Sequence, residues 1–189
     1  MKPIENLKTE HEDILLMLDV LERMSEKISS GESVQIDHLK DVLKFLQVFA
    51  DKCHHGKEEN YLFTAMLESG VPEKGGPLSV MLSEHNRGRR FVEEMKSLLD
   101  SYEKGDSGSL MVLATPLLQY VELQLSHIWK ENNLLYPLAE EVLPGDKLSA
   151  LEGQFERFEN EEIGQGTCNA FHEMIRNLSR IYLDRVIES

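Results

Sequence analysis

Histidine and glutamate side chains recur in this chain at a spacing that suits metal binding. Glu58 lies four residues after His54, and Glu131 lies four residues after His127. Side chains four apart lie on one face of an α-helix, one turn apart. The imidazole and the carboxylate of each pair can therefore reach the same ion, or the carboxylate can bridge two ions. This combination of ligands suits iron, manganese or zinc better than copper(I) or calcium.

Two further histidines, His11 and His85, lie on apolar helical stripes in other parts of the chain. Taken singly, each feature has an ordinary explanation. One His-x-x-x-Glu is usually a solvated pair on a helix surface, and one histidine on an apolar stripe is usually a hydrogen-bonded core residue. Burying six such groups without partners would be costly, so their combination favours a metal site. The candidate ligands are His11, His54, Glu58, His85, His127 and Glu131.

Composition and charge argue against several classes of function. The 189 residues carry a formal net charge of −14. Nucleic acid and anionic membrane surfaces both reward clustered lysine and arginine, so neither is an expected partner. No apolar run is long enough to cross a bilayer, and the N-terminal residues do not resemble a signal peptide. A cytoplasmic location is therefore expected.

The two cysteines are consistent with that location. Cys53 and Cys168 lie far apart in the sequence and form no CxxC motif. Free thiols in a reducing compartment are the simplest expectation. A Cys53–Cys168 disulfide is the alternative.

Apolar residues recur at steps of three and four, which predicts an all-α protein. Turns rich in glycine and proline separate the apolar stripes. The expected helical segments are residues 4–30, 34–69, 78–104, 109–143 and 147–187. Short connections make successive helices antiparallel neighbours. We therefore predict one domain over residues 1–189, with an up-down-up-down four-helix bundle in residues 1–144 and a C-terminal helical extension in residues 145–189.

Helix geometry tests whether the candidate ligands can meet in such a bundle. The starts of the first and third helices lie at the same end as the ends of the second and fourth. His11 and His85 are each roughly 10 Å from the start of their helix at 1.5 Å per residue. Glu58 and Glu131 are roughly 17 Å from the end of theirs. Helix ends vary by a few residues, so all six candidates are expected in one layer.

Four other side chains are weaker candidates. His55 and Glu59 repeat the His-x-x-x-Glu spacing one step round the helix, and His55 is either a ligand, a partner of a ligand or solvated. Glu159 and Glu162 lie on the extension, at a height near that of His127. One of them is expected to act as a ligand or to hydrogen-bond a ligating histidine. The alternative is that the extension packs outside the bundle and both carboxylates face solvent.

Four segments of this chain resemble, in order, the hemerythrin-like (HHE cation-binding) family. They are TEHEDI from Thr9, DKCHHGKEENYLF from Asp51, GGPLSVMLSEHNRGRR from Gly75 and HIWKENNLLYPLAE from His127. The resemblance covers about residues 3–143, and FERFENEEIGQG is similar to the extension of longer members. It implies a non-haem centre of two iron ions, held by the six candidate ligands and bridged by Glu58 and Glu131. Zinc or manganese are further candidates in recombinant protein.

The chain departs from the oxygen-carrying hemerythrins on the third helix. Those proteins have His-x-x-x-His there, whereas this chain has Met81 four residues before His85 and Arg89 four residues after it. A thioether is a poor ligand for iron, so the resemblance implies a more open centre. Ferritin-like di-iron bundles are the nearest competing class, but they carry Glu-x-x-His on two helices, and this sequence has no such motif.

The resemblance implies a protein that binds, senses or reacts with O₂, NO or peroxide, or that stores iron. An open centre favours these roles over reversible oxygen carriage. The alternative is an enzyme that turns over peroxide or NO, or a donor of iron in the repair of iron–sulfur centres. A role without catalytic turnover is favoured, and a regulatory module would need a partner protein. The sequence does not fix the oligomeric state.

Overall fold

Helices account for nearly all of the chain in the computed structural model, which describes residues 3–164 and 166–183. No strand occurs within those two ranges. The expected all-α fold class is therefore confirmed. Within the same ranges, no helix combines the length and the apolar character that crossing a membrane requires.

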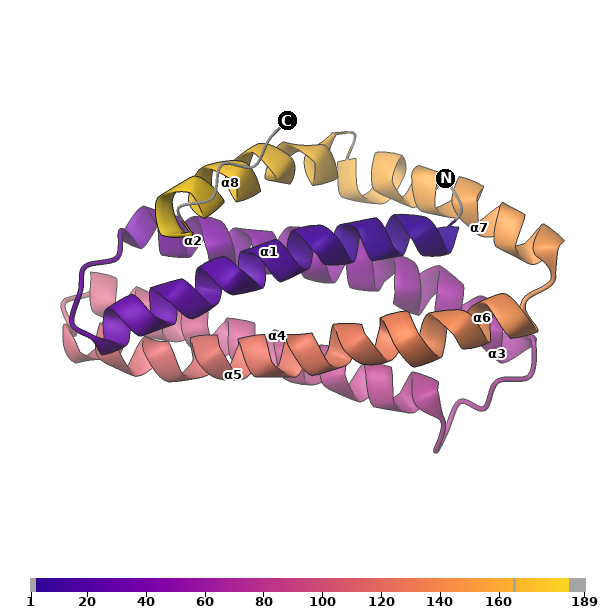
Figure 1. Ribbon diagram of the computed structural model, residues 1–189, viewed down its shortest axis with the longest axis horizontal. Helices are drawn as coiled ribbons and strands as arrows, with labels where there is room; N and C mark the ends of the chain where they lie inside the picture. The colour runs from indigo at the N-terminus through magenta and orange to yellow at the C-terminus, as the bar shows by residue number, and fades with distance from the viewer. Residues whose placement is uncertain (1–2, 165, 184–189) are drawn as a thin grey trace.

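Four long helical segments extend along the long axis of the molecule (Figure 1). The first is α1 (Pro3–Ser29), and the third is α4 (Pro77–Glu103). The second consists of α2 (Ile36–Phe45), η1 (Leu46–His55), η2 (Glu58–Leu62) and α3 (Phe63–Glu68). The fourth consists of α5 (Gly108–Lys130), η3 (Glu131–Leu135) and α6 (Tyr136–Val142). These bounds agree closely with the segments predicted from the apolar periodicity.

The C-terminal extension lies along one side of these segments (Figure 1). It consists of α7 (Gly145–Arg157), η4 (Phe158–Gly164) and α8 (Thr167–Tyr182). Gly164, the last residue of η4, and Gly166, which precedes α8, have φ of 106° and 75°. Residues with a Cβ would be strained in this left-handed conformation. Helix α8 packs against α1 and η1, so the extension covers the first two segments.

The apolar core consists of two clusters with a polar layer between them. The larger cluster includes Met24, Phe45 and Met95, and the smaller one includes Leu7 and Tyr136. Each of the four long segments contributes apolar residues to both clusters. The candidate ligands occur on each segment between these two sets of residues. Packing of the apolar stripes on either side therefore fixes the height of the polar layer.

Cys53 on η1 and Cys168 on α8 form a disulfide across a separation of 115 residues. The expectation of free thiols is therefore wrong for this structure. The reason is the path of the extension, which returns along α1 and brings α8 against η1. Sequence spacing gave no sign of that contact.

Candidate metal centre

Stretches of π-helix carry many of the candidate ligands. In this geometry a backbone amide bonds to the carbonyl five residues earlier, as in Gly56 to Asp51, Phe63 to Glu58 and Tyr136 to Glu131. The wider turn holds more residues than a turn of α-helix, so the angle between consecutive side chains is smaller. As a result, His54 and His55 both point into the core, where each is at most 4% exposed.

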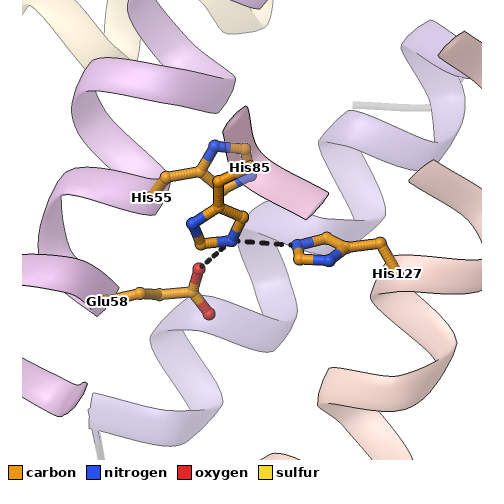
Figure 2. Close-up of side chains that lie close together, drawn as sticks. All are labelled: His55, Glu58, His85 and His127. Carbon is orange, nitrogen blue, oxygen red and sulfur yellow. Dashed lines mark hydrogen bonds and ion pairs between the residues drawn. The ribbon is translucent and has the colours of Figure 1, made fainter. Parts of the chain in front are cut away.

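The first group of potential ligands contains three histidines and one glutamate, shown in Figure 2. His55 and Glu58 come from the second segment, His85 from α4 and His127 from α5. The Nε2 atoms of His85 and His127 lie 3.1 Å apart. The His55 ring stacks on the His85 ring with the centroids 3.9 Å apart. One potential ligand atom from each residue lies within 4.8 Å of all the others.

The second group contains His11, His54, Glu58 and Glu131, and its ligand atoms also lie within 4.8 Å of one another. The His11 Nε2 atom lies 3.1 Å from Glu131 Oε2. The rings of His11 and His54 have their centroids 4.5 Å apart. All four residues are at most 1% exposed. The two groups thus form one buried cluster.

Glu58 and Glu131 link the two groups. The Oε2 atom of Glu131 faces His11, while its Oε1 atom lies 3.0 Å from His127 Nε2. The Oε2 atom of Glu58 lies 3.5 Å from His85 Nε2 and 3.9 Å from His54 Nε2. Each carboxylate therefore lies between histidines of the first group and histidines of the second group. A ligand that bridges two metal ions requires this position.

Tyr136 adds a contact that the sequence analysis did not anticipate. Its side chain is 0% exposed, and its hydroxyl donates a hydrogen bond of 2.7 Å to Glu58 Oε1. The same hydroxyl lies 3.4 Å from His11 Nε2. The contact orients the Glu58 carboxylate so that Oε2 faces the histidines.

The outward-facing Nδ1 atoms of the five histidines all have an oxygen partner on a neighbouring side chain. The pairs are His11 with Asn132 at 2.9 Å, His54 with Glu10 at 2.9 Å, His55 with Asp51 at 3.4 Å, His85 with Glu59 at 2.6 Å and His127 with Glu84 at 3.0 Å. An Nδ1–H that donates to such an oxygen leaves the Nε2 lone pair free for a metal. The five imidazole rings are therefore held in orientations that leave each Nε2 available to a metal ion.

Cationic side chains hold most of these oxygen partners in turn. Arg89 donates from Nε to Asp51 at 2.8 Å and from Nη2 to Glu59 at 2.7 Å. Lys57 forms an ion pair with Glu10, and Lys130 forms one with Glu84. Burial disfavours charge on these carboxylates, but hydrogen bonds to a histidine and to Arg89 or Lys130 lower the pKa values of Asp51, Glu59 and Glu84. For Glu10, burial outweighs the effect of Lys57 and raises the pKa.

Burial and mutual repulsion shift the pKa values inside the cluster in opposite directions. Burial lowers the pKa of His54, and it lowers the pKa of His55 to about 3. Burial and the nearby charge of Glu131 raise the pKa of Glu58. Burial also disfavours charge on His127, but Glu131 outweighs it and raises the pKa of His127 to about 10. The cluster therefore combines His54 and His55, which burial keeps neutral, with buried carboxylates, and a cation would stabilise such a ligand set.

A direct test of fit is whether the buried polar atoms find partners within the protein. Among the described residues, five buried side-chain atoms have no hydrogen bond: His54 Nε2, Glu58 Oε2, both carboxylate oxygens of Glu131, and Ser179 Oγ. Leaving such atoms unsatisfied costs roughly 1–3 kcal/mol each, and more for charged groups. Four of the five atoms, all except Ser179 Oγ, belong to the two groups of potential ligands, so the residues present fit a metal centre.

The structure brings together all six residues that the spacing singled out. His55, a weaker candidate, joins them, and its imidazole stacks on that of His85. Met81 itself is buried in the smaller apolar cluster. His55 of the second segment is therefore a further potential ligand beside His85.

The three weaker carboxylate candidates lie outside the cluster. Glu59 accepts a hydrogen bond from His85 Nδ1 instead of facing the centre. The expectation that Glu159 or Glu162 would be a ligand or a direct partner of a histidine is wrong. Glu162 is exposed and accepts from the Tyr61 hydroxyl at 3.3 Å, and Glu159 accepts from Lys57 at 2.5 Å. The extension covers the bundle and places both carboxylates beyond the inner histidines.

Lys57 connects the extension to the centre, and its removal should be destabilising. The side chain is 0% exposed and lies between Glu10 of α1 and Glu159 of η4. We expect Lys57→Met to lower the free energy of unfolding by about 3–5 kcal/mol, because two carboxylates lose a buried partner. Chemical denaturation of the metal-free protein measures this effect.

Lys130→Met is the matched control. Lys130 also holds a carboxylate that accepts from a histidine of the cluster, but it is 25% exposed. Its loss should cost roughly 1 kcal/mol or less. Equal losses in the two variants would show that the burial of Lys57 does not determine its contribution.

Comparison with known proteins gives an independent view of this arrangement. The family model described as "Hemerythrin HHE cation binding domain" matches residues 2–139. That range contains every residue of the two ligand groups. It ends before the C-terminal extension.

Several curated proteins are similar to the chain. The iron-sulfur cluster repair protein YtfE of Dickeya chrysanthemi is 35% identical over 89 residues, which are 46% of this chain and 40% of that protein. YtfE of Musicola paradisiaca is 28% identical over 133 residues, which are 67% of this chain and 56% of that protein. An uncharacterized protein of Mycobacterium bovis, Mb2018, is 18% identical over 93% of this chain and 68% of its own length. No solved structure gave a significant match.

Proposed function

The chain belongs to the hemerythrin HHE cation-binding domain family, and from this premise we propose that its buried cluster holds two iron ions. His11 and His54 would bind one ion. His55, His85 and His127 would bind the other. Glu58 and Glu131 would bridge them. The observation that carries the proposal is the set of buried histidine and carboxylate atoms that lack partners in the described part of the chain.

The proposed role is to bind or react with O₂, NO or peroxide, within a single domain whose four long segments form an up-down-up-down bundle. Iron, when bound, would supply the redox chemistry and the binding of the small ligand. The protein supplies the apolar clusters that exclude water above and below the cluster. It also supplies the fixed orientation of each imidazole through its Nδ1 partner.

Tyr136 and the outer ion pairs would control the polarity of the centre. The Tyr136 hydroxyl holds its proton towards Glu58 Oε1, which keeps one oxygen of that carboxylate occupied. Arg89 offsets the charge of Asp51 and Glu59 beside His55 and His85. Neither group needs to leave its position for a small ligand to bind, so the chain offers a preformed site.

A second candidate role follows from the similarity to the YtfE proteins, whose names describe iron–sulfur cluster repair. This chain spans only 40% of the length of the first of these relatives. Release of iron to a damaged cluster would require a centre that loses metal readily. Binding by five histidines with fixed Nδ1 partners favours retention, so we place iron donation second.

Metal content tests the proposal. Protein produced with iron should contain two iron ions per chain, with a visible spectrum that changes when O₂, NO or peroxide is added to the reduced form. Rapid mixing separates the roles: reversible oxygenation indicates a carrier, and oxidation with turnover indicates an enzyme. Loss of iron to an external chelator faster than either reaction would favour iron donation. Binding of no more than one ion under iron-replete conditions would contradict a two-iron centre.

A further inference from the structure

A pocket of about 360 Å³ leads from the surface between η1, α4 and α5 to two of the cluster histidines. Exposed Lys52 and Glu93 lie at its rim, and half-buried Val48 lies between them and the interior. His55 and His85, at most 4% exposed, form part of its floor. The pocket therefore joins solvent to the face of the cluster that carries three histidines.

The floor is lined by polar side chains that are themselves buried. Tyr120 and Gln124 are 2% and 3% exposed and line the pocket beside the histidines. Gly88 on α4 keeps this floor open, because a Cβ at that position would lie 3.0 Å from Gln124 Nε2 and 3.6 Å from the Tyr120 ring. A small molecule that reaches the floor would meet hydrogen-bonding groups instead of a purely apolar wall.

The charges around the pocket are balanced. Two acidic side chains, Asp51 and Glu93, and two basic side chains, Lys52 and Arg89, line it. The Arg89 guanidinium is already bonded to Asp51 and Glu59. The chain as a whole carries a formal net charge of −14, which repels anions at a distance. The charged side chains of this lining therefore carry no net positive charge of the kind that attracts an anionic ligand.

We propose that this pocket is the access route to the metal centre and that it admits small neutral molecules, such as nitric oxide, dioxygen or hydrogen peroxide, in preference to anions. The inference rests on the proposed function for the identity of the centre. The inference adds two features to that function. The small molecule approaches the centre from the side of His55 and His85, and the charges around the pocket favour neutral molecules over anions. Val48, Gly88 and Gln124 set the width of the route.

Val48→Trp tests the route by placing a large side chain in its outer part. We expect nitric oxide to associate with the reduced, iron-loaded variant roughly tenfold more slowly than with the parent protein. The matched control is Val80→Trp on α4, at a position that is 45% exposed and not part of the pocket lining. An unchanged rate in Val48→Trp would overturn the proposal. If the parent protein itself binds no nitric oxide, the proposed function fails instead.

A measurement on metal-free protein separates access from reactivity. Dissolved dioxygen is paramagnetic and enhances the relaxation of nearby nuclei. We expect strong enhancement at the Gly88 amide and the Gln124 side-chain amide, compared with the equally buried Val20 amide on α1, and loss of that enhancement in Val48→Trp. Gly88→Ala, which narrows the floor by one methyl group, should reduce the enhancement in part. Enhancement at Gly88 no greater than at Val20 would exclude this pocket as the route.

Glu93→Lys tests the selection by charge without touching the floor, since Glu93 is exposed at the rim. We expect azide, an anion, to bind the oxidised iron-loaded variant several-fold faster than the parent at low salt. The association rate of nitric oxide, which is neutral, should stay unchanged. If both rates change equally, or neither changes, charge at the rim does not select the ligand.

Discussion

Replacing Glu131 with alanine is expected to remove most of the bound metal from both positions. Both of its carboxylate oxygens are buried without a hydrogen bond in the described structure, and they face His11 on one side and His127 on the other. Removing an outer hydrogen-bond partner of a metal ligand typically costs about 10–100-fold in affinity. Loss of a ligand shared by two ions should cost more than that.

The measurements for Glu131→Ala are iron content after gel filtration and thermal unfolding with metal present. The variant should also lose the stabilisation that metal binding adds to the folded state. Glu162→Ala is the control, because that carboxylate is exposed on the extension. A variant that retains two irons and the parental melting temperature would show that Glu131 is not a bridging ligand.

His55→Ala is expected to weaken binding of one ion much more than the other. His55 belongs only to the group with His85 and His127, whereas His11 and His54 belong to the second group. We expect one tightly held iron per chain and a second bound at least about 100-fold more weakly, a larger loss than removal of an outer partner causes. Titration with ferrous iron, followed by calorimetry or absorption, measures the two affinities.

A second substitution in the same background tests the geometry. Met81 lies one turn before His85 on α4, so Met81→His would present an imidazole on the same face at i,i+4 spacing. The double variant His55→Ala/Met81→His should recover much of the lost affinity. Met81→His alone should slow autoxidation of the reduced centre only if a ligand position remains open beside His55. Failure of the double variant to bind more iron than His55→Ala would show that position 81 does not face the metal.

The helices and the main ligand set could be predicted from the sequence because both follow the α-helical repeat. Apolar residues at steps of three and four define the buried stripes, and His54 with Glu58 or His127 with Glu131 fall on those stripes. The layer in which they meet follows from helix length and short connections. Similarity to the family gave the same residues by a different argument.

The features that escaped prediction depend on contacts between distant segments. His55 follows His54, and consecutive residues of an α-helix point about 100° apart, so the α-helical repeat alone does not predict that both face the centre. Both lie in the π-helical stretch η1, where that angle is smaller. Lysine side chains are usually exposed, yet Asn6, Glu10 and Glu159 enclose the ammonium group of Lys57. The Cys53–Cys168 disulfide likewise depends on the return path of the extension.

The π-helical stretches make the number of residues in the second segment as important as their identity. Each stretch contains more residues per turn than an α-helix would use for the same length of axis. Deletion of one residue between Leu46 and His55 would favour ordinary α-helical bonding, in which consecutive side chains point about 100° apart about the axis. His54 and His55, which both lie in that stretch, could then no longer both face the cluster. The segment should therefore accept many substitutions outside the cluster but almost no change in length.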